Sequence, residues 1–236
     1  AKNPIIQPDY TFRQTLDSKL HIEMEYLDCL NYHDQVLDLL YTEVCRHTAE
    51  SRAVLLQLKE RVPMVLVSNF YGNISTVLRE FGFDGIFDHI IESAVVGVRK
   101  PDPRIFQLGV EALGMKADEV TVVGDSIDKD IIPAHRAGCN TVWIRGEQWT
   151  DDPVDESQAN LAIDNLTELL DNNNIKYIYS KLSVMKQTNV KPAEGKLGIM
   201  VVGCGAVATT FMTGVLMTRK GLTKPVGSMT QYDKIR

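Results

Sequence analysis

The middle of the chain alternates short apolar runs with amphipathic segments, and this alternation limits the fold more than any other feature. The apolar runs are "PMVLVSN", "EVTVVGDS" and "NTVWIRG", with a weaker one at "HIIES". The segments between them have helical spacing and end at glycines: Gly82, Gly114 and Gly138. Repeated strand–helix units of this kind predict an α/β fold, with a parallel sheet covered by helices on both faces.

The spacing of apolar residues differs in other parts of the chain, and these differences divide it into four regions. From Thr15 to about His47, apolar residues recur at steps of three and four without a strand, which predicts two or three helices. After the strand–helix region comes a stretch without apolar periodicity, and a last apolar run begins near residue 197. We therefore expect a helical region over 1–50, an α/β core over 51–180, a linker over 181–196 and a further unit over 197–236.

Charge and composition exclude several classes of protein. The net charge is −6, but residues 181–236 hold nine Lys/Arg and two Asp/Glu (+7), which leaves −13 for residues 1–180. This asymmetry indicates separate units, and the basic residues form no stripe with aromatics, so we expect no nucleic-acid partner. No window is apolar enough for a membrane span, and no signal peptide is visible. The four widely spaced cysteines indicate reduced thiols and a cytoplasmic protein.

Polar residues gather where the predicted strands end. Ser68 and Asn69 follow one strand, and Asp125, Ser126, Asp128 and Asp130 follow another, while Lys100 lies on a loop before a helix. Each could have a local role, as a turn, a helix cap or a solvated lysine. In parallel α/β sheets, however, ligands bind beyond the carboxyl ends of the strands. Hydroxyl and ammonium donors beside carboxylates there suit a phosphate group with a hard cation.

These motifs, in this order, resemble the haloacid dehalogenase (HAD) superfamily of phosphatases and dehalogenases over residues 15–170. "VLVSN" resembles its second motif, "VRKPDPRIF" its third and "VVGDSIDKDIIPAHRAG" its fourth. The resemblance implies a Rossmann-like parallel sheet with a partial helical cap over 1–50. It also implies roles: Ser68 and Asn69 hold a phosphoryl group, and Lys100 offsets its charge. Asp125 would bind Mg²⁺, and Asp130 would support that site.

The family's first motif, D-x-D-x-T after an apolar strand, has no counterpart in the printed sequence. The one D-x-D, Asp128-Lys129-Asp130, belongs to the fourth motif and lacks the threonine. In the family the first-motif strand lies mid-sheet, between those of the second and fourth motifs. We therefore expect two unpaired strand edges, poor folding of these 236 residues alone and no turnover. Two explanations stay open: a fragment whose start lies upstream, or a non-catalytic member of the family.

The last region begins with a glycine-rich turn. "GCGAVA" places Gly203, Gly205 and Ala208 at the G-x-G-x-x-A spacing that lets a backbone approach a pyrophosphate, although a simple strand–turn–helix is the alternative. Residues 191–236 resemble the opening of bacterial myo-inositol-1-phosphate synthase, which implies NAD as the cofactor of a completed domain. We expect an incomplete second Rossmann unit here, and a chain that is a slice of a longer fusion.

The leading functional interpretation is a magnesium-dependent phosphomonoesterase acting on a small phosphorylated metabolite, with inositol phosphate as a candidate. Three alternatives remain. The protein could be a 2-haloacid dehalogenase, an NAD-dependent inositol-phosphate synthase with an accessory HAD domain, or a remnant without activity. The carboxylates of "GDSIDKD" favour the phosphatase, because a metal would need them.

Overall fold

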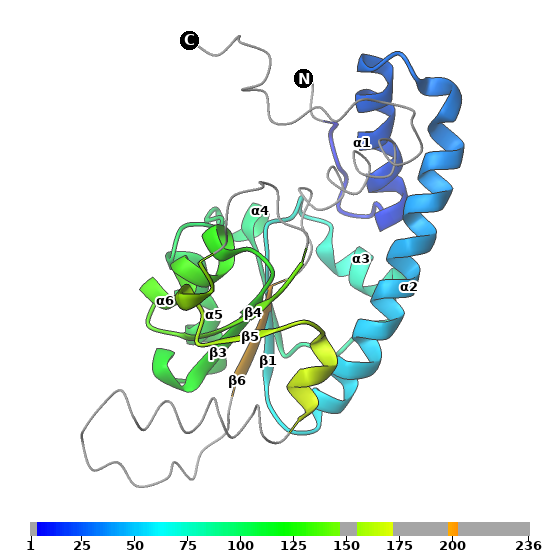
Figure 1. Ribbon diagram of the computed structural model, residues 1–236. Coiled ribbons are helices and arrows are strands. Elements are labelled where there is room, and N and C mark those ends of the chain that lie inside the picture. The colour runs from blue at the N-terminus through cyan, green and yellow to red at the C-terminus, as the bar shows by residue number, and fades with distance from the viewer. Residues whose placement is uncertain (1–3, 147–154, 172–197, 203–236) are drawn as a thin grey trace, which may run out of the picture.

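A six-stranded parallel sheet forms the centre of the computed structural model, which describes residues 4–146, 155–171 and 198–202 (Figure 1). The strand order is β2-β1-β6-β3-β4-β5. The strands are β1 (Met64–Ser68), β2 (His89–Glu92), β3 (Val120–Gly124), β4 (Asn140–Ile144), β5 (Leu161–Ile163) and β6 (Gly198–Val202). Every pairing between neighbours is parallel, so all six carboxyl ends meet at one edge of the sheet. The predicted α/β fold is confirmed.

The sequence pattern identifies most clearly the strands whose two faces are both buried. All five residues of β1 and all five of β3 are buried. A strand in that position reads as a continuous apolar run, because neither face meets water. The edge strand β5 has three residues and no alternating pattern, and the sequence analysis missed it.

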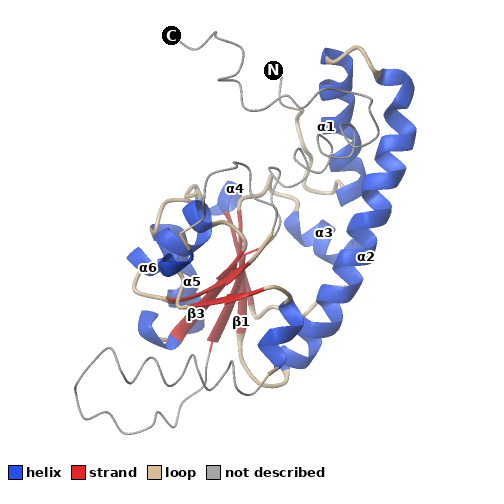
Figure 2. Ribbon diagram, viewed as in Figure 1, coloured by secondary structure: helices blue, strands red, loops and turns tan. Residues whose placement is uncertain are grey.

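Helices cover both faces of this sheet, as Figure 2 shows. They include α3 (Ile74–Glu80), α4 (Ser93–Val96), α5 (Arg104–Leu113) and α6 (Ile132–Arg136), together with the second half of the long helix described below. Ile105 and Phe106 of α5 are fully buried in one core cluster with Val65 and Val122 of the sheet. The glycines that predicted helix ends all have positive φ, which residues with a side chain rarely adopt. The helix predicted at "DNLTELLDNN" is a short 3₁₀ turn, Leu166–Leu170.

One long helix joins the cap to the core. The cap consists of α1 (Phe12–Tyr26) and the first half of α2 (His33–Lys59), which bury leucines against each other, among them Leu16, Leu20 and Leu40. The second half of α2 buries Leu55 and Leu58 in the core. At 1.5 Å per residue, α2 is about 40 Å long and runs unbroken through residue 50. None of the described helices has the length and apolar character needed to cross a membrane.

The central position of the sheet is held by a strand from near the C-terminus. β6 pairs with β1 on one side and with β3 on the other, and Met200 lies opposite both Val65 and Val122. The sequence analysis correctly predicted a strand before the glycine-rich turn. Its expectation of two unpaired edges was wrong, because β6 occupies that place and its backbone satisfies both neighbours. The expected poor folding thus loses its stated cause.

This pairing predicts that β6 stabilises the whole sheet. We expect Met200→Pro to lower the free energy of unfolding strongly, because proline lacks the N–H of a ladder hydrogen bond in a strand with neighbours on both sides. His89→Pro, at the first residue of the edge strand β2, serves as the control, since proline is tolerated there. Denaturant melts of both variants would test this. Equal midpoints for Met200→Pro and the unsubstituted chain would contradict the pairing of β6.

Candidate active site

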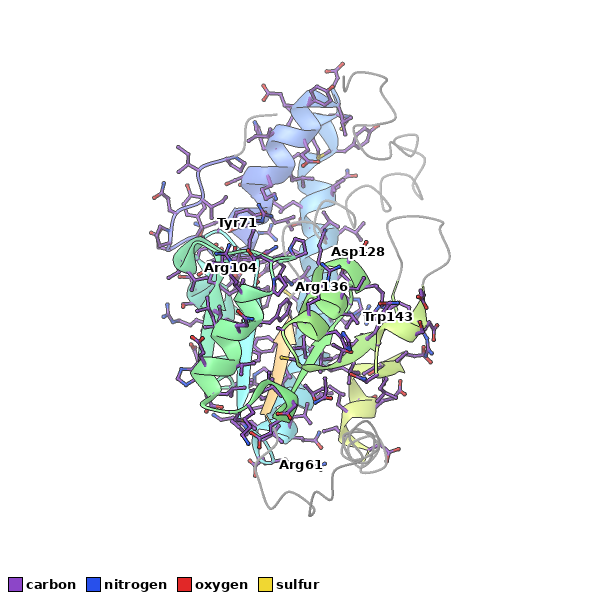
Figure 3. All side chains as sticks on the ribbon, turned by 90° about the vertical axis from the view of Figure 1, so that its left-hand side faces the viewer. Arg61, Tyr71, Arg104, Asp128, Arg136 and Trp143 are labelled. Atoms are coloured by element: carbon purple, nitrogen blue, oxygen red, sulfur yellow. The ribbon has the colours of Figure 1, made fainter. Side chains whose placement is uncertain are left out.

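The polar residues singled out by the sequence come together at the carboxyl edge of the sheet. Ser68 ends β1, Lys100 lies between α4 and α5, and Asp125 directly follows β3. Asp130 lies in a π-helical turn, Ile127–Ile131, that leads into α6. In Figure 3, Asp128 of this turn lies towards the cap, whereas Arg61 lies at the opposite end of the molecule. The site is therefore built from three loops that share one end of the sheet.

A buried ion pair links two of these loops. The Lys100 ammonium donates to Asp130 Oδ1 at 2.8 Å, and the two side chains are only 7% and 1% exposed. The second oxygen, Asp130 Oδ2, accepts a hydrogen bond from Ser126 N at 3.1 Å. Both carboxylate oxygens thus have partners, as a buried charge requires. Lys100 is held with its ammonium inside the protein.

Asn69 fixes the backbone of Lys100. Its Oδ1 accepts from Lys100 N at 2.8 Å, and its Nδ2 donates to Lys100 O at 3.1 Å. The sequence analysis placed Asn69 beside the phosphoryl group. In the structure both ends of its amide bind the Lys100 backbone, so its described contacts position the lysine.

The hydroxyl of Ser68 has no hydrogen-bond partner among the described residues. Its Oγ is fully buried at the end of β1. A buried hydroxyl without a partner costs free energy, which a ligand that accepts its hydrogen bond would recover. This is the behaviour expected of a group that binds a ligand.

Gly124 makes room for Asp130. A Cβ at Gly124 would lie 2.5 Å from the Asp130 Cβ and 2.9 Å from its Oδ2, closer than such atoms approach in proteins. The turn itself is capped by Ser126, whose Oγ accepts from Lys129 N at 3.2 Å. The "GDS" sequence thus has a steric reason: glycine lets the following turn fold back onto the strand.

Asp125 presents an exposed carboxylate directly after β3, next to the buried ion pair. Its side chain reaches solvent, and the Trp143 indole donates to its backbone oxygen at 3.0 Å. Surrounding protein atoms, and then the nearby Asp130 charge, raise the pKa of the Asp125 carboxyl, while Lys100 lowers it. A bound cation would stabilise the ionised form of such a group.

The donor set fits part of a magnesium site. Within the described residues, no group of three or more His, Cys, Asp or Glu side chains could hold a metal. Mg²⁺ is commonly bound by one or two carboxylates, with water and substrate phosphate completing its shell. Asp125 could be a direct ligand, and Asp130, whose two oxygens are occupied, a supporting one.

The sequence analysis missed Glu92, which holds the loop after β1. Its buried carboxylate accepts from Gly72 N at 2.6 Å and from Ile74 N at 3.4 Å. Burial raises the pKa of Glu92, and these backbone N–H groups oppose that rise. Ser93 adds a contact, since Phe70 N donates to its Oγ at 3.2 Å. No sequence pattern marked this role, because "HIIES" reads only as a weak strand end.

The predicted cofactor-binding glycines lie elsewhere in the chain. Gly203, Gly205 and Ala208 are outside the described residues. Three cysteines that are described, Cys29, Cys45 and Cys139, are free thiols, as the sequence analysis expected.

Comparisons with known proteins show the family to which the chain belongs. The model of the haloacid dehalogenase-like hydrolases matches residues 13–138, and the chain belongs to this family of hydrolases. A glyceraldehyde 3-phosphate phosphatase from Methanopyrus kandleri is 41% identical over 96 residues, which cover 40% of this chain and 41% of that protein. Among solved structures, β-phosphoglucomutase from Clostridium difficile matches at 18% identity and a TM-score of 0.47, with 75% of this chain and 80% of that chain covered.

A further match belongs to a different class of enzyme. Inositol-3-phosphate synthase 1 from Bacteroides thetaiotaomicron is 58% identical over 53 residues, which cover 22% of this chain and 12% of that protein. The chain therefore spans about two-fifths of the Methanopyrus phosphatase and a much smaller part of the synthase.

The buried ion pair predicts strong coupling between its members. Lys100→Met alone leaves Asp130 buried without its cation, and we expect a loss of about 3–5 kcal/mol in the free energy of unfolding. Adding Asp130→Asn should recover part of that loss, because the charge is removed while an acceptor for Ser126 N remains. A double-mutant cycle by urea denaturation measures this. Additive losses in the double variant would show that the two groups do not interact.

The contact between Gly124 and Asp130 predicts a local steric effect. Gly124→Ala should destabilise the protein by about 1–3 kcal/mol, as overpacking a tight site does. Gly146→Ala is the matched control, since a Cβ there meets no atom of residues 4–146, 155–171 or 198–202 within 4 Å. Thermal unfolding of the two variants tests the difference. A Gly124→Ala protein as stable as Gly146→Ala would mean that the turn can move aside freely.

Proposed function

We propose that the α/β core is a magnesium-dependent phosphomonoesterase domain that acts on a small phosphorylated metabolite. The observation that carries this proposal is the buried hydroxyl of Ser68, which has no partner among the described residues and lies at the same edge of the sheet as the Lys100–Asp130 pair. Relatives named as phosphatases, including phosphoserine phosphatase from Thermus thermophilus at 35% identity over 83 residues, support it. The free thiols favour a reducing compartment, for which we propose the cytoplasm.

In this proposal each residue either binds the negatively charged phosphoryl group or holds a residue that does. The Ser68 hydroxyl donates to a phosphoryl oxygen, and the Lys100 ammonium neutralises negative charge nearby. Asn69 and Asp130 hold Lys100 from its backbone and its ammonium. Asp125 and Asp130 would hold Mg²⁺, which supplies further neutralisation of the phosphoryl oxygens when bound. Such positioning and neutralisation account for most catalysis of phosphoryl transfer.

The group that would attack the phosphorus atom is not among the residues of this candidate site. The printed sequence has no D-x-D-x-T motif, and the backbone of β6 occupies the place between β1 and β3. We propose that these 236 residues bind phosphate without turning it over. A longer protein would hydrolyse phosphomonoesters if its first-motif strand took the place of β6 between β1 and β3 and supplied the attacking aspartate.

A fusion with an inositol-phosphate synthase is the second candidate function. The 53-residue match at 58% identity and the resemblance of residues 191–236 favour it. In a completed domain, Gly203, Gly205 and Ala208 would approach the pyrophosphate of NAD. The product of such a synthase is a phosphomonoester, so inositol phosphate is a candidate substrate of the phosphatase domain. A dehalogenase is disfavoured, since it needs no metal and would leave the exposed carboxylate of Asp125 without a ligand, whereas Asp130 is paired with Lys100 in either case.

Ser68 allows a clean test of phosphate binding. Ser68→Ala removes a hydroxyl that has no described partner, so the fold should keep its stability. We expect the affinity for inorganic phosphate, measured calorimetrically with Mg²⁺ present, to fall about tenfold or more, the effect of losing one hydrogen bond to a charged group.

Thr121→Val is the matched control for this measurement. Thr121 carries a second buried hydroxyl without a described partner, but it lies in β3 three residues before that strand ends. Its loss should leave phosphate affinity unchanged. Equal affinity in Ser68→Ala and the unsubstituted chain would overturn the role of Ser68. Phosphate binding that does not require Mg²⁺ would count against the metal site and favour the dehalogenase alternative.

A further inference from the structure

A lysine of the cap lies against the loop that follows β1. Lys19, on α1, donates from Nζ to the Tyr71 hydroxyl at 2.5 Å, and the ammonium lies 4.8 Å from the centre of the Tyr71 ring. Both side chains are half-buried. Figure 3 shows Tyr71 directly beneath the cap helices. The cap thus places a positive charge beside the core at the end of the sheet that carries the candidate site.

This positive charge is not balanced by a carboxylate. None of the ion pairs within 4 Å in the described part of the chain includes Lys19. By contrast, Arg13 on the same helix pairs with Asp38 at 2.5 Å. An ammonium has three N–H donors, of which Tyr71 accepts one, and the tyrosine O–H is a further donor. The chemical complement of such a pair is an anion that only accepts hydrogen bonds, such as a carboxylate.

Tyr71 is held close to Ser68. The two residues are three positions apart, so their Cα atoms lie within about 11 Å of each other. The loop is held by hydrogen bonds on both sides of Tyr71. Asn69 bonds to Lys100 and Phe70 to Ser93 before it, and Gly72 bonds to Glu92 after it. The position of Tyr71 relative to the Ser68 hydroxyl is therefore fixed by the core.

The cap is anchored to the same loop. Asn73 donates to Thr15 Oγ1 at 2.9 Å and to Tyr10 O at 2.8 Å. Thr15 and Lys19 are four residues apart and so share one face of α1. That face lies along residues 71–73, and the anchor at Thr15 positions Lys19.

We propose that Lys19 and Tyr71 recognise a carboxylate on the substrate, so that the preferred substrate is a small phosphomonoester with a second anionic group. The inference rests on the proposed phosphatase function, in which Ser68 and Lys100 bind the phosphoryl group. Lys19 and Tyr71 then determine specificity and take no part in the bond-breaking step. Inositol phosphate, which has no second anion, would rank below a phosphorylated acid.

Two probes of equal carbon number test this proposal by calorimetry with the full chain and Mg²⁺. 3-Phosphoglycerate carries a carboxylate where glycerol 3-phosphate carries a hydroxymethyl group. We expect the chain to bind 3-phosphoglycerate about tenfold more tightly, as one charge-assisted hydrogen bond allows. Lys19→Met should abolish this preference and leave the affinity for glycerol 3-phosphate unchanged, whereas Lys19→Arg should retain much of it.

Lys59→Met is the control for loss of a lysine charge. Lys59 ends α2 and donates to Gly85 O, and it is two residues from Arg61 at the far end of the molecule (Figure 3). Its replacement should leave the preference intact. If Lys19→Met lowers the affinity for both probes equally, the lysine only positions the cap on the core, and the inference is overturned. If the chain binds both probes equally, the inference fails while the phosphatase proposal stands; if neither probe nor inorganic phosphate binds, both fail.

Discussion

The Lys100–Asp130 ion pair is the interaction on which the candidate site depends. It joins the loop before α5 to the turn after β3, and both charges lie away from water. Buried charges persist only when their remaining hydrogen-bonding groups are satisfied. Ser126 N satisfies Asp130 on one side, and Asn69 fixes the Lys100 backbone on the other. Three loops that are far apart in sequence are thus held in one arrangement. The Ser68 hydroxyl beside them has no hydrogen-bond partner in the described part of the chain.

The sheet beneath the site is completed from an unexpected part of the chain. β1 and β3 carry the residues of the candidate site at their carboxyl ends. The gap between the facing backbone edges of these two strands is wide enough for one strand. β6 fills this place, pairing four of its residues with β1 and four with β3. A parallel sheet covered by helices on both faces leaves no water to satisfy an open edge, so some strand must lie there. The place between β1 and β3 is thereby filled by the last described segment of the chain, residues 198–202.

Two features connect the cap to the core: the continuous helix α2, and hydrogen bonds from α1 to the loop after β1. α2 buries residues in the cap cluster at one end and in the core cluster at the other, so one continuous helix sets the spacing of the two parts. The polar connection runs from α1 to the loop after β1, through Thr15 with Asn73 and through Lys19 with Tyr71. Substrate selection by the cap and phosphate binding by the core would therefore act on one loop.

Sequence alone determined the α/β class, the strands β1, β3 and β4, the helix ends at glycine and the polar candidate residues that meet at the carboxyl edge of the sheet. These features are local: continuous apolar runs mark strands buried on both faces, and positive φ requires glycine at a helix end. Only the tertiary structure decided the rest. The position of β6 depends on which backbone edges remain open, and the roles of Asn69, Glu92 and Lys19 depend on partners 20 to 52 residues away. No local pattern records such pairings, because they arise when the folded chain brings distant loops to one edge of the sheet.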